Sequence, residues 1–270
     1  MTDTFGGLKL VPGETPDLSK LDASDTSTWP GGKRKGEAAL PKLREELDRL
    51  QELFYADARR GLLVILQGMD TSGKDGVIRH VFEGVNPQGV RVSSFKTPTP
   101  EESAHDFLWR IHRCVPSKGE IVIFNRSQYE DVLVARVHRL VPQKVWTKRF
   151  DAINAFEREL VGEGISVLKF FLNISREEQA RRLRARIEDS TKRWKLSDAD
   201  FHERRYWTEY RSAYEDMLHR TSTAWAPWYL LPSDRKWFRN LVVSTILVEE
   251  LRGLKLRYPE PSVTVSLKFD

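Results

Sequence analysis

The sequence predicts an α/β protein, a three-layer α/β/α sandwich in which helices cover both faces of a parallel sheet. Short runs of apolar residues, typical of buried strands, alternate along the chain with longer segments whose apolar residues recur every three or four positions. One such run, residues 62–66, leads directly into a glycine-rich turn and then a helix. That order of strand, glycine turn and helix is the setting of a phosphate-binding loop.

The remaining elements follow in a regular order. Residues 36–59 carry leucines at helical spacing, which predicts an amphipathic helix that packs on the domain and is also a candidate surface for self-association. Strands are predicted at residues 62–66, 90–95, 120–124, 165–174 and 227–232. Further helices are predicted from residue 77, over 100–114 and 146–162, from the N-cap Ser175, and over 198–220 and 237–251.

A chain of 270 residues accommodates one α/β domain with appendages. We expect an N-terminal arm over residues 1–35, a catalytic domain over 36–258 with a lid at about 176–200, and a C-terminal tail over 259–270. No apolar run approaches the roughly 20 residues that cross a bilayer. The first residues also lack the features of a secretion signal. The sequence therefore predicts a soluble, cytoplasmic protein with no membrane partner.

The composition argues against several kinds of site. The one cysteine, Cys114, excludes an intrachain disulfide and any multi-cysteine metal site. The six histidines show no metal-ligand spacing. If the protein uses a metal ion, we therefore expect it to be held by oxygen atoms.

Positive charge is concentrated in one part of the chain. The net charge is +5, and residues 176–195 hold eight basic side chains against four acidic ones. Such an excess is typical of a protein with a polyanionic partner. The alternative is a solvated helix face, which we accept for Arg181 and Arg184. The better candidates for a lid that closes over phosphates are Arg182, Arg186, Lys192 and Lys195.

The glycine turn has the spacing of a phosphate-binding loop, Gly68-x4-Gly73-Lys74, with Asp75 where the usual pattern has Ser or Thr. Glycines let the backbone approach a ligand, so that N–H groups and a helix N-terminus point at phosphate oxygens, and lysine adds a positive charge. An incidental glycine turn is the alternative. The strand before the motif and the helix after it favour the phosphate-binding interpretation.

A second polar cluster, Asn125 to Asp131, follows the strand at 120–124 and should lie on the same side of the sheet as Lys74. Carboxylates beside a phosphate site would repel the ligand unless a divalent cation lies between, so Asp70 and Asp131 suggest Mg²⁺. Alternatively, Asp70 completes a turn and Asp131 caps a helix. Arg126 is a candidate phosphate ligand, although it could instead pair with Glu130.

These motifs together resemble the polyphosphate kinase 2 family. They are Gly68-Met69-Asp70-x-x-Gly73-Lys74-Asp75-Gly76, Phe124-Asn125-Arg126-Ser127-x-Tyr129-Glu130-Asp131-Val132, and Gln179-x-x-Arg182-x-x-x-Arg186 with residues 192–197. The resemblance runs from about residue 31 to 258. Many members carry Asp where this chain has Asn125. Asn125 together with Glu130-Asp131 resembles the class III subgroup, which phosphorylates both nucleoside mono- and diphosphates.

The resemblance implies a phosphate-loop (P-loop) kinase fold with a helical lid, and phosphoryl transfer between inorganic polyphosphate and a nucleotide that depends on Mg²⁺, or Mn²⁺ in its place. It implies that Asp70 and Asp131 serve the metal, while Lys74, Arg126, Arg182 and Arg186 hold the polyphosphate end and the transferring group. Further predicted substrate contacts are Gly68, Thr71, Ser72, Gly73, Asp75, Asn125, Glu130, Lys192 and Lys195.

We therefore expect a polyphosphate-dependent kinase that converts AMP to ADP and ADP to ATP. If the acceptor is a phosphate, no general base is required, because the acceptor is already anionic near neutral pH. Adenine nucleotides are the expected acceptors, with guanine nucleotides as further candidates, and the protein is expected to form a homo-oligomer without binding nucleic acid. Two alternatives remain: an ATP-dependent nucleotide kinase and a nucleic-acid-binding P-loop protein.

Overall fold

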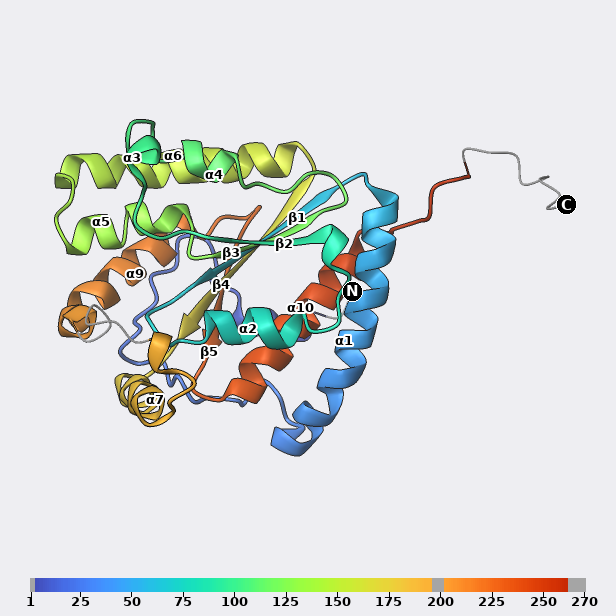
Figure 1. Ribbon diagram of the computed structural model, residues 1–270, viewed down its shortest axis with the longest axis horizontal. Coiled ribbons are helices and arrows are strands. Elements are labelled where there is room, and N and C mark those ends of the chain that lie inside the picture. The colour runs from blue at the N-terminus through green and yellow to red at the C-terminus, as the bar shows by residue number, and fades with distance from the viewer. Residues whose placement is uncertain (1–2, 196–201, 262–270) are drawn as a thin grey trace, which may run out of the picture.

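The computed structural model describes residues 3–195 and 202–261, and in this part of the chain five parallel strands form one central sheet (Figure 1). The strands are β1 (Gly61–Gln67), β2 (Val90–Ser94), β3 (Ile121–Asn125), β4 (Ile165–Asn173) and β5 (Trp228–Pro232). Their order across the sheet is β2-β3-β1-β4-β5, and every neighbouring pair is parallel. The predicted fold class and all five predicted strands are confirmed.

Helices cover both faces of this sheet (Figure 1). One face carries α1 (Gly32–Asp57), α2 (Lys74–Val81) and α10 (Lys236–Gly253). The other carries α3 (Pro100–Ser103), α4 (Trp109–His112), α5 (Val134–Val137), α6 (Gln143–Gly162) and α9 (Trp207–Thr221). Helix α7 (Arg176–Glu188) follows β4. Across residues 3–195 and 202–261, no helix combines the length and apolar composition that a membrane crossing needs.

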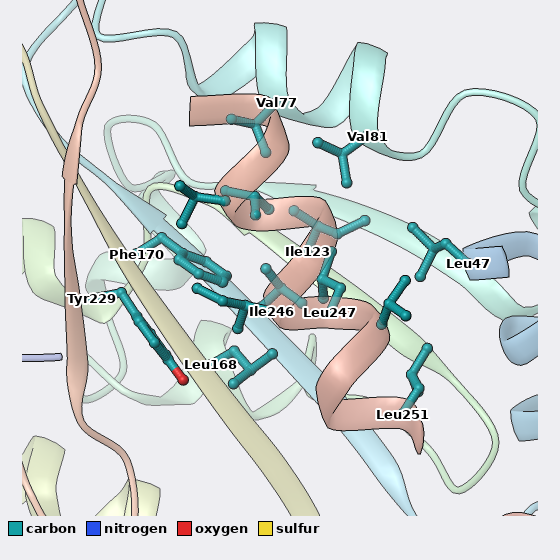
Figure 2. Close-up of a cluster of buried hydrophobic side chains, with 14 of the residues drawn as sticks. Leu47, Val77, Val81, Ile123, Leu168, Phe170, Tyr229, Ile246, Leu247 and Leu251 are labelled. Carbon is teal, nitrogen blue, oxygen red and sulfur yellow. The ribbon is translucent and has the colours of Figure 1, made fainter. Parts of the chain in front are cut away.

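The central strand explains why its sequence is a continuous apolar run. Leu62, Val64 and Leu66 point into one hydrophobic core with α1, α2 and α10, whereas Leu63 and Ile65 point into a second core with α6 and α9. Figure 2 shows the first core, in which side chains of α10 lie against Phe170, Leu168 and Tyr229 of the sheet. A strand covered on both faces has no polar side, and the glycine loop that ends at Lys74 follows β1 directly.

The prediction of one helix over residues 100–114 was wrong. Thr99 and Glu102 form a capping box that starts α3, but this helix ends at Ser103. Its end is followed by a turn in which the Asp106 carboxylate accepts a hydrogen bond from the Leu108 N–H at 2.9 Å, and α4 begins at Trp109. Aspartate competes with helical hydrogen bonding in this way. Helix α5 was not predicted from the sequence. For the helix predicted over residues 198–220, the predicted start lies outside the described residues.

The N-terminal segment packs along the domain from residue 3 onward. Phe5 is fully buried against Phe238 and Trp29. Lys9 forms an antiparallel bridge with Tyr229 of β5, and the Leu10 N–H donates to the Trp228 carbonyl at 2.8 Å. This segment therefore borders the outer strand β5. The proposed boundaries at residues 35 and 258 stay predictions.

Candidate active site

The turn between β1 and α2 requires its glycines. Gly68 has φ 146° and Gly73 has φ 110°, a region that side-chain-bearing residues rarely adopt. A Cβ on Gly68 would lie 2.7 Å from the Leu172 carbonyl oxygen, and a Cβ on Gly73 would lie 1.8 Å from Nη1 of Arg239. Between them, the hydroxyls of Thr71 and Ser72 are buried, with no hydrogen-bond partner within the described residues. The loop is therefore closely backed by the sheet and α10, and it holds two buried hydroxyls that are available to a ligand.

Lys74, the first residue of α2, folds back over this loop. Its Nζ donates to the carbonyls of Gly68 at 2.6 Å and Met69 at 3.2 Å, and the residue is only 7% exposed. Burial, and then the nearby positive charge of Arg126, lower the pKa of Lys74 to about 8. A bound anion would favour the charged form. The lysine and the helix N-terminus thus form a site that suits phosphate.

Arg126 joins the first two motifs. It directly follows β3, with φ 63°, and its guanidinium donates to Asp70 Oδ1 at 2.5 Å and to Glu130 Oε2 at 3.0 Å. The charge of Glu130, and then that of Asp70, raises the pKa of Arg126 against the opposing effect of burial. The pairing with Glu130 that the sequence left open is present, together with a second one to Asp70. Arg126 and Lys74 consequently lie in one site.

A second link connects the two motifs at their edges. The side-chain amide of Asn125 donates to Asp75 Oδ1 at 2.9 Å. Asp75 lies in the first turn of α2, where a negative charge is favoured by the helix dipole. Asp75, which stands where a phosphate-binding loop usually has a hydroxyl, is therefore held by Asn125.

A cavity of about 280 Å³ opens beside the loop. Its lining includes the charged side chains of Asp70, Arg126 and Glu130 and the apolar or aromatic side chains of Leu133, Tyr210 and Tyr214. The cavity thus combines charged groups from the two motifs with apolar and aromatic surface from the segment before α5 and from α9, as a small-molecule site does.

The side chain of Asp131 has other partners than that of Glu130. Its Oδ1 accepts from Arg149 Nη1 at 3.1 Å, and Arg110 lies 3.8 Å from Oδ2. Burial raises the pKa of Asp131, although both arginines act against that rise. Asp131 is not among the residues that line the cavity. The structure therefore brings Asp70 and Glu130 together but does not bring Asp131 to them.

The carboxylates near the loop suit a hard cation that is shared with a ligand. Among the described residues, no group of three or more His, Cys, Asp or Glu side chains is placed to hold a metal ion. Mg²⁺, however, usually binds through one or two carboxylates together with phosphate oxygens and waters. Asp70 and Glu130, both beside Arg126 and both lining the cavity, fit that donor set.

Arg182 of α7 forms hydrogen bonds to backbone carbonyls of the glycine loop. Its Nη1 donates to the carbonyls of Thr71 at 2.9 Å and Ser72 at 3.0 Å, and its Nη2 donates to those of Ser233 and Asp234. Its Nε donates to Glu178. All five N–H groups of the guanidinium therefore have protein acceptors. In this structure Arg182 holds the loop to the segment between β5 and α10, and its predicted contact with substrate stays a prediction.

The other predicted lid residues lie farther along. Arg186 is half-buried on α7, one turn after Arg182, and Lys192 pairs with Asp189 at 2.5 Å. Lys195 closes a short 3₁₀ helix (Arg193–Lys195), and residues 196–200 of the predicted lid lie outside the described residues. Gln179 on α7 donates to the Asp70 carbonyl at 3.1 Å and accepts from Arg204 at 2.9 Å, so α7 directly contacts the loop.

A buried ion pair supports the segment after β3 and was missed in the sequence. Lys169, in the middle of β4, donates to Glu157 at 2.7 Å and to the Thr221 carbonyl at 2.6 Å, and both charged side chains are fully buried. Glu157 also accepts from Tyr129 at 2.6 Å and from Gln128 at 3.0 Å. A lysine inside an otherwise apolar strand was the available signal. Through Tyr129, the pair anchors the turn that carries Arg126 and Glu130.

Taken together, a parallel sheet of order β2-β3-β1-β4-β5, a lysine-bearing glycine loop after β1 and an arginine with carboxylates after β3 define a P-loop kinase, an enzyme that transfers phosphoryl groups. More specifically, residues 31–258 match the family model of polyphosphate kinase 2, and the chain belongs to that family.

Similar proteins agree with this assignment. The chain is 54% identical, over 94% of its length and 95% of the relative's, to an AMP/ADP-polyphosphate phosphotransferase of Meiothermus ruber. It is 46% identical to an ADP-polyphosphate phosphotransferase of Rhodopseudomonas palustris, over 80% of this chain and 79% of the relative. The crystal structure of polyphosphate kinase 2 from Arthrobacter aurescens TC1 superposes with a TM-score of 0.93 at 41% identity, covering 97% of this chain and 94% of that one.

Proposed function

We propose that this enzyme transfers phosphoryl groups between inorganic polyphosphate and adenine nucleotides, converting AMP to ADP and ADP to ATP. The observation that carries the proposal is that Arg126 lines the same cavity as Gly68, Met69 and Asp70 of the glycine loop, and lies close enough to Lys74 at the start of α2 to lower its pKa. The similarity to the AMP/ADP-polyphosphate phosphotransferase of Meiothermus ruber supports both acceptors. A chain polyanion also suits the excess of basic residues between 176 and 195.

In this proposal the protein acts mainly by holding and neutralising phosphate groups. Lys74 and the loop amides bind one phosphate, and Arg126 turns from its two carboxylates toward the transferring group. Asp70 would hold Mg²⁺ with Glu130 beside it, and Asp131, which the sequence assigns to the metal together with Asp70, stays a predicted ligand. When bound, the ion neutralises charge on the phosphate oxygens. Because the acceptor is itself an anionic phosphate, positioning and charge neutralisation supply most of the rate enhancement.

A donor-and-acceptor assay tests this function. Purified protein with polyphosphate, Mg²⁺ and AMP should yield ADP first and ATP later. The nucleotides are separated and quantified on an anion-exchange column. ATP replaces polyphosphate as donor in a second arm, and Mn²⁺ or guanine nucleotides are substituted in others. If only ATP serves as donor, the protein is an ordinary nucleotide kinase. If neither donor gives a nucleotide product, the proposed function is wrong.

The pH dependence of phosphate-chain binding follows from Lys74. Its pKa is lowered to about 8 by burial and by Arg126, so the ligand-free protein loses this charge as the pH rises through that value. We expect the Kd for tripolyphosphate, measured by titration calorimetry, to rise between pH 7 and pH 9. The Lys74→Arg variant should show a smaller rise, because a guanidinium stays protonated over this range. Equal pH profiles for the two proteins would contradict this assignment.

A further inference from the structure

Arg239 is a buried arginine that no motif pointed to. It lies in the first turn of α10 and is only 2% exposed. Its Nη1 donates to the Ser72 carbonyl at 3.2 Å, while its Nε and Nη2 donate to the side-chain oxygen of Asn240 at 3.2 and 2.9 Å. The guanidinium also lies where a Cβ on Gly73 or Gly76 would stand. It therefore packs directly against the outer side of the phosphate-binding loop.

Two guanidinium groups share the carbonyl of Ser72. Arg182 reaches it from α7 at 3.0 Å and Arg239 reaches it from α10 at 3.2 Å. In a trans peptide the C=O and the following N–H point in opposite directions. By holding the Ser72 oxygen on the α10 side, the two arginines direct the Gly73 N–H away from α10. That N–H is one of the groups that such a loop offers to a phosphate.

The charge of Arg239 has no carboxylate to balance it in the part of the chain that the structure describes. Its hydrogen-bond partners are a backbone carbonyl and a neutral amide, and the charge that acts on it is the like charge of Arg182. Burial, and then Arg182, lower the pKa of Arg239 below its usual value, which indicates that this position is unfavourable for a cation. Buried charges in proteins are normally paired. An anion bound in the loop would supply the missing partner charge.

We propose that Arg239 is a positioning residue for phosphate binding: it orients the Ser72–Gly73 peptide and places a fixed positive charge behind the loop. This inference rests on the proposed function, since it assumes that the loop holds a phosphate of the substrate. It assigns Arg239 no direct contact with that substrate. It also explains why a cation is retained at a buried site where a neutral side chain would be less costly to the fold.

The test compares Arg239→Met and Arg239→Lys with a matched control, Arg252→Met. Arg252 lies on the same helix, is exposed and pairs with Glu46, so the control removes the same charge from a distant position. We expect Arg239→Met to raise the Kd for tripolyphosphate about tenfold, equivalent to about 1.4 kcal/mol. The KM for polyphosphate should rise with a smaller change in kcat. Arg239→Lys should recover part of the loss, and Arg252→Met should bind like the wild type.

Thermal unfolding with and without tripolyphosphate separates a positioning role from a structural one. Arg239→Met should melt near the wild-type temperature without ligand but gain less stability when ligand is added. An equal fall in both melting temperatures, or an unchanged Kd, would overturn the inference while leaving the proposed function in place. If the wild-type protein neither binds tripolyphosphate nor uses polyphosphate as donor, both proposals fall together.

Discussion

Replacing Lys74 with alanine should lower the turnover of polyphosphate and AMP by roughly 10²–10³-fold, the scale seen when one preorganised charge-stabilising donor is removed. Lys74 is the cation at the start of α2, held over the loop by the carbonyls of Gly68 and Met69. Without it, the negative charge on the transferring group would lose one of the positive charges that the proposed function assigns to it. The measurement is the initial rate of ADP formation at saturating substrates.

The fold of this variant should be intact, with an unchanged far-ultraviolet circular dichroism spectrum, because the Lys74 ammonium bonds to carbonyls of the loop and both hydrophobic cores keep all their apolar side chains. Lys42→Ala is the matched control, since Lys42 is exposed on α1. It should retain the wild-type rate. Near-normal turnover in Lys74→Ala would show that the loop between β1 and α2 is not the phosphate site.

Replacing Lys169 with methionine should destabilise the protein by about 3–5 kcal/mol, the usual cost of breaking a buried ion pair by removing one partner. Glu157 would remain fully buried, with only the neutral donors of Tyr129 and Gln128. The free energy of unfolding from urea titration measures the loss. Turnover below the melting transition should also fall, because Tyr129 belongs to the turn that carries Arg126.

The double variant Lys169→Met with Glu157→Gln provides the control for this effect. It removes both charges and keeps an oxygen at position 157 to accept from Tyr129 and Gln128. Since no unpaired charge is left, it should regain a large part of the lost stability. A single Lys169→Met variant as stable as the wild type would show that the pair contributes nothing to the fold.

The fold was predictable because its signals are local. Each strand is a short apolar run, and a strand covered on both faces, such as β1, has no polar side to obscure the pattern. Ser175 was recognised as an N-cap, and its side chain does accept a hydrogen bond from the Glu178 N–H. The error at residues 100–114 arose because an aspartate side chain, Asp106, competes for backbone hydrogen bonds in a segment with helical spacing.

The sequence predicted several residues of the candidate site, but not the contacts that their side chains make. Sequence placed Lys74 and Arg126 at the same end of the sheet, which the structure confirms. The sequence could not reveal that most N–H groups of Arg182 donate to backbone carbonyls, or that the Asp131 carboxylate lies beside Arg149 and Arg110. The contact of Arg239 with the loop could not be predicted for a related reason. Its partner Ser72 is distant in the chain, so only the packing of α10 against the loop brings the two together.

The segment at residues 5–10 has a consequence for how copies of this chain can associate. An outer strand exposes backbone groups that can pair with another molecule, and proteins commonly block such edges. Here Lys9 and Leu10 occupy part of the β5 edge. Joining two sheets edge to edge through β5 would first require this segment to detach. A truncated chain that begins after residue 10 would lack the block and become more prone to aggregate.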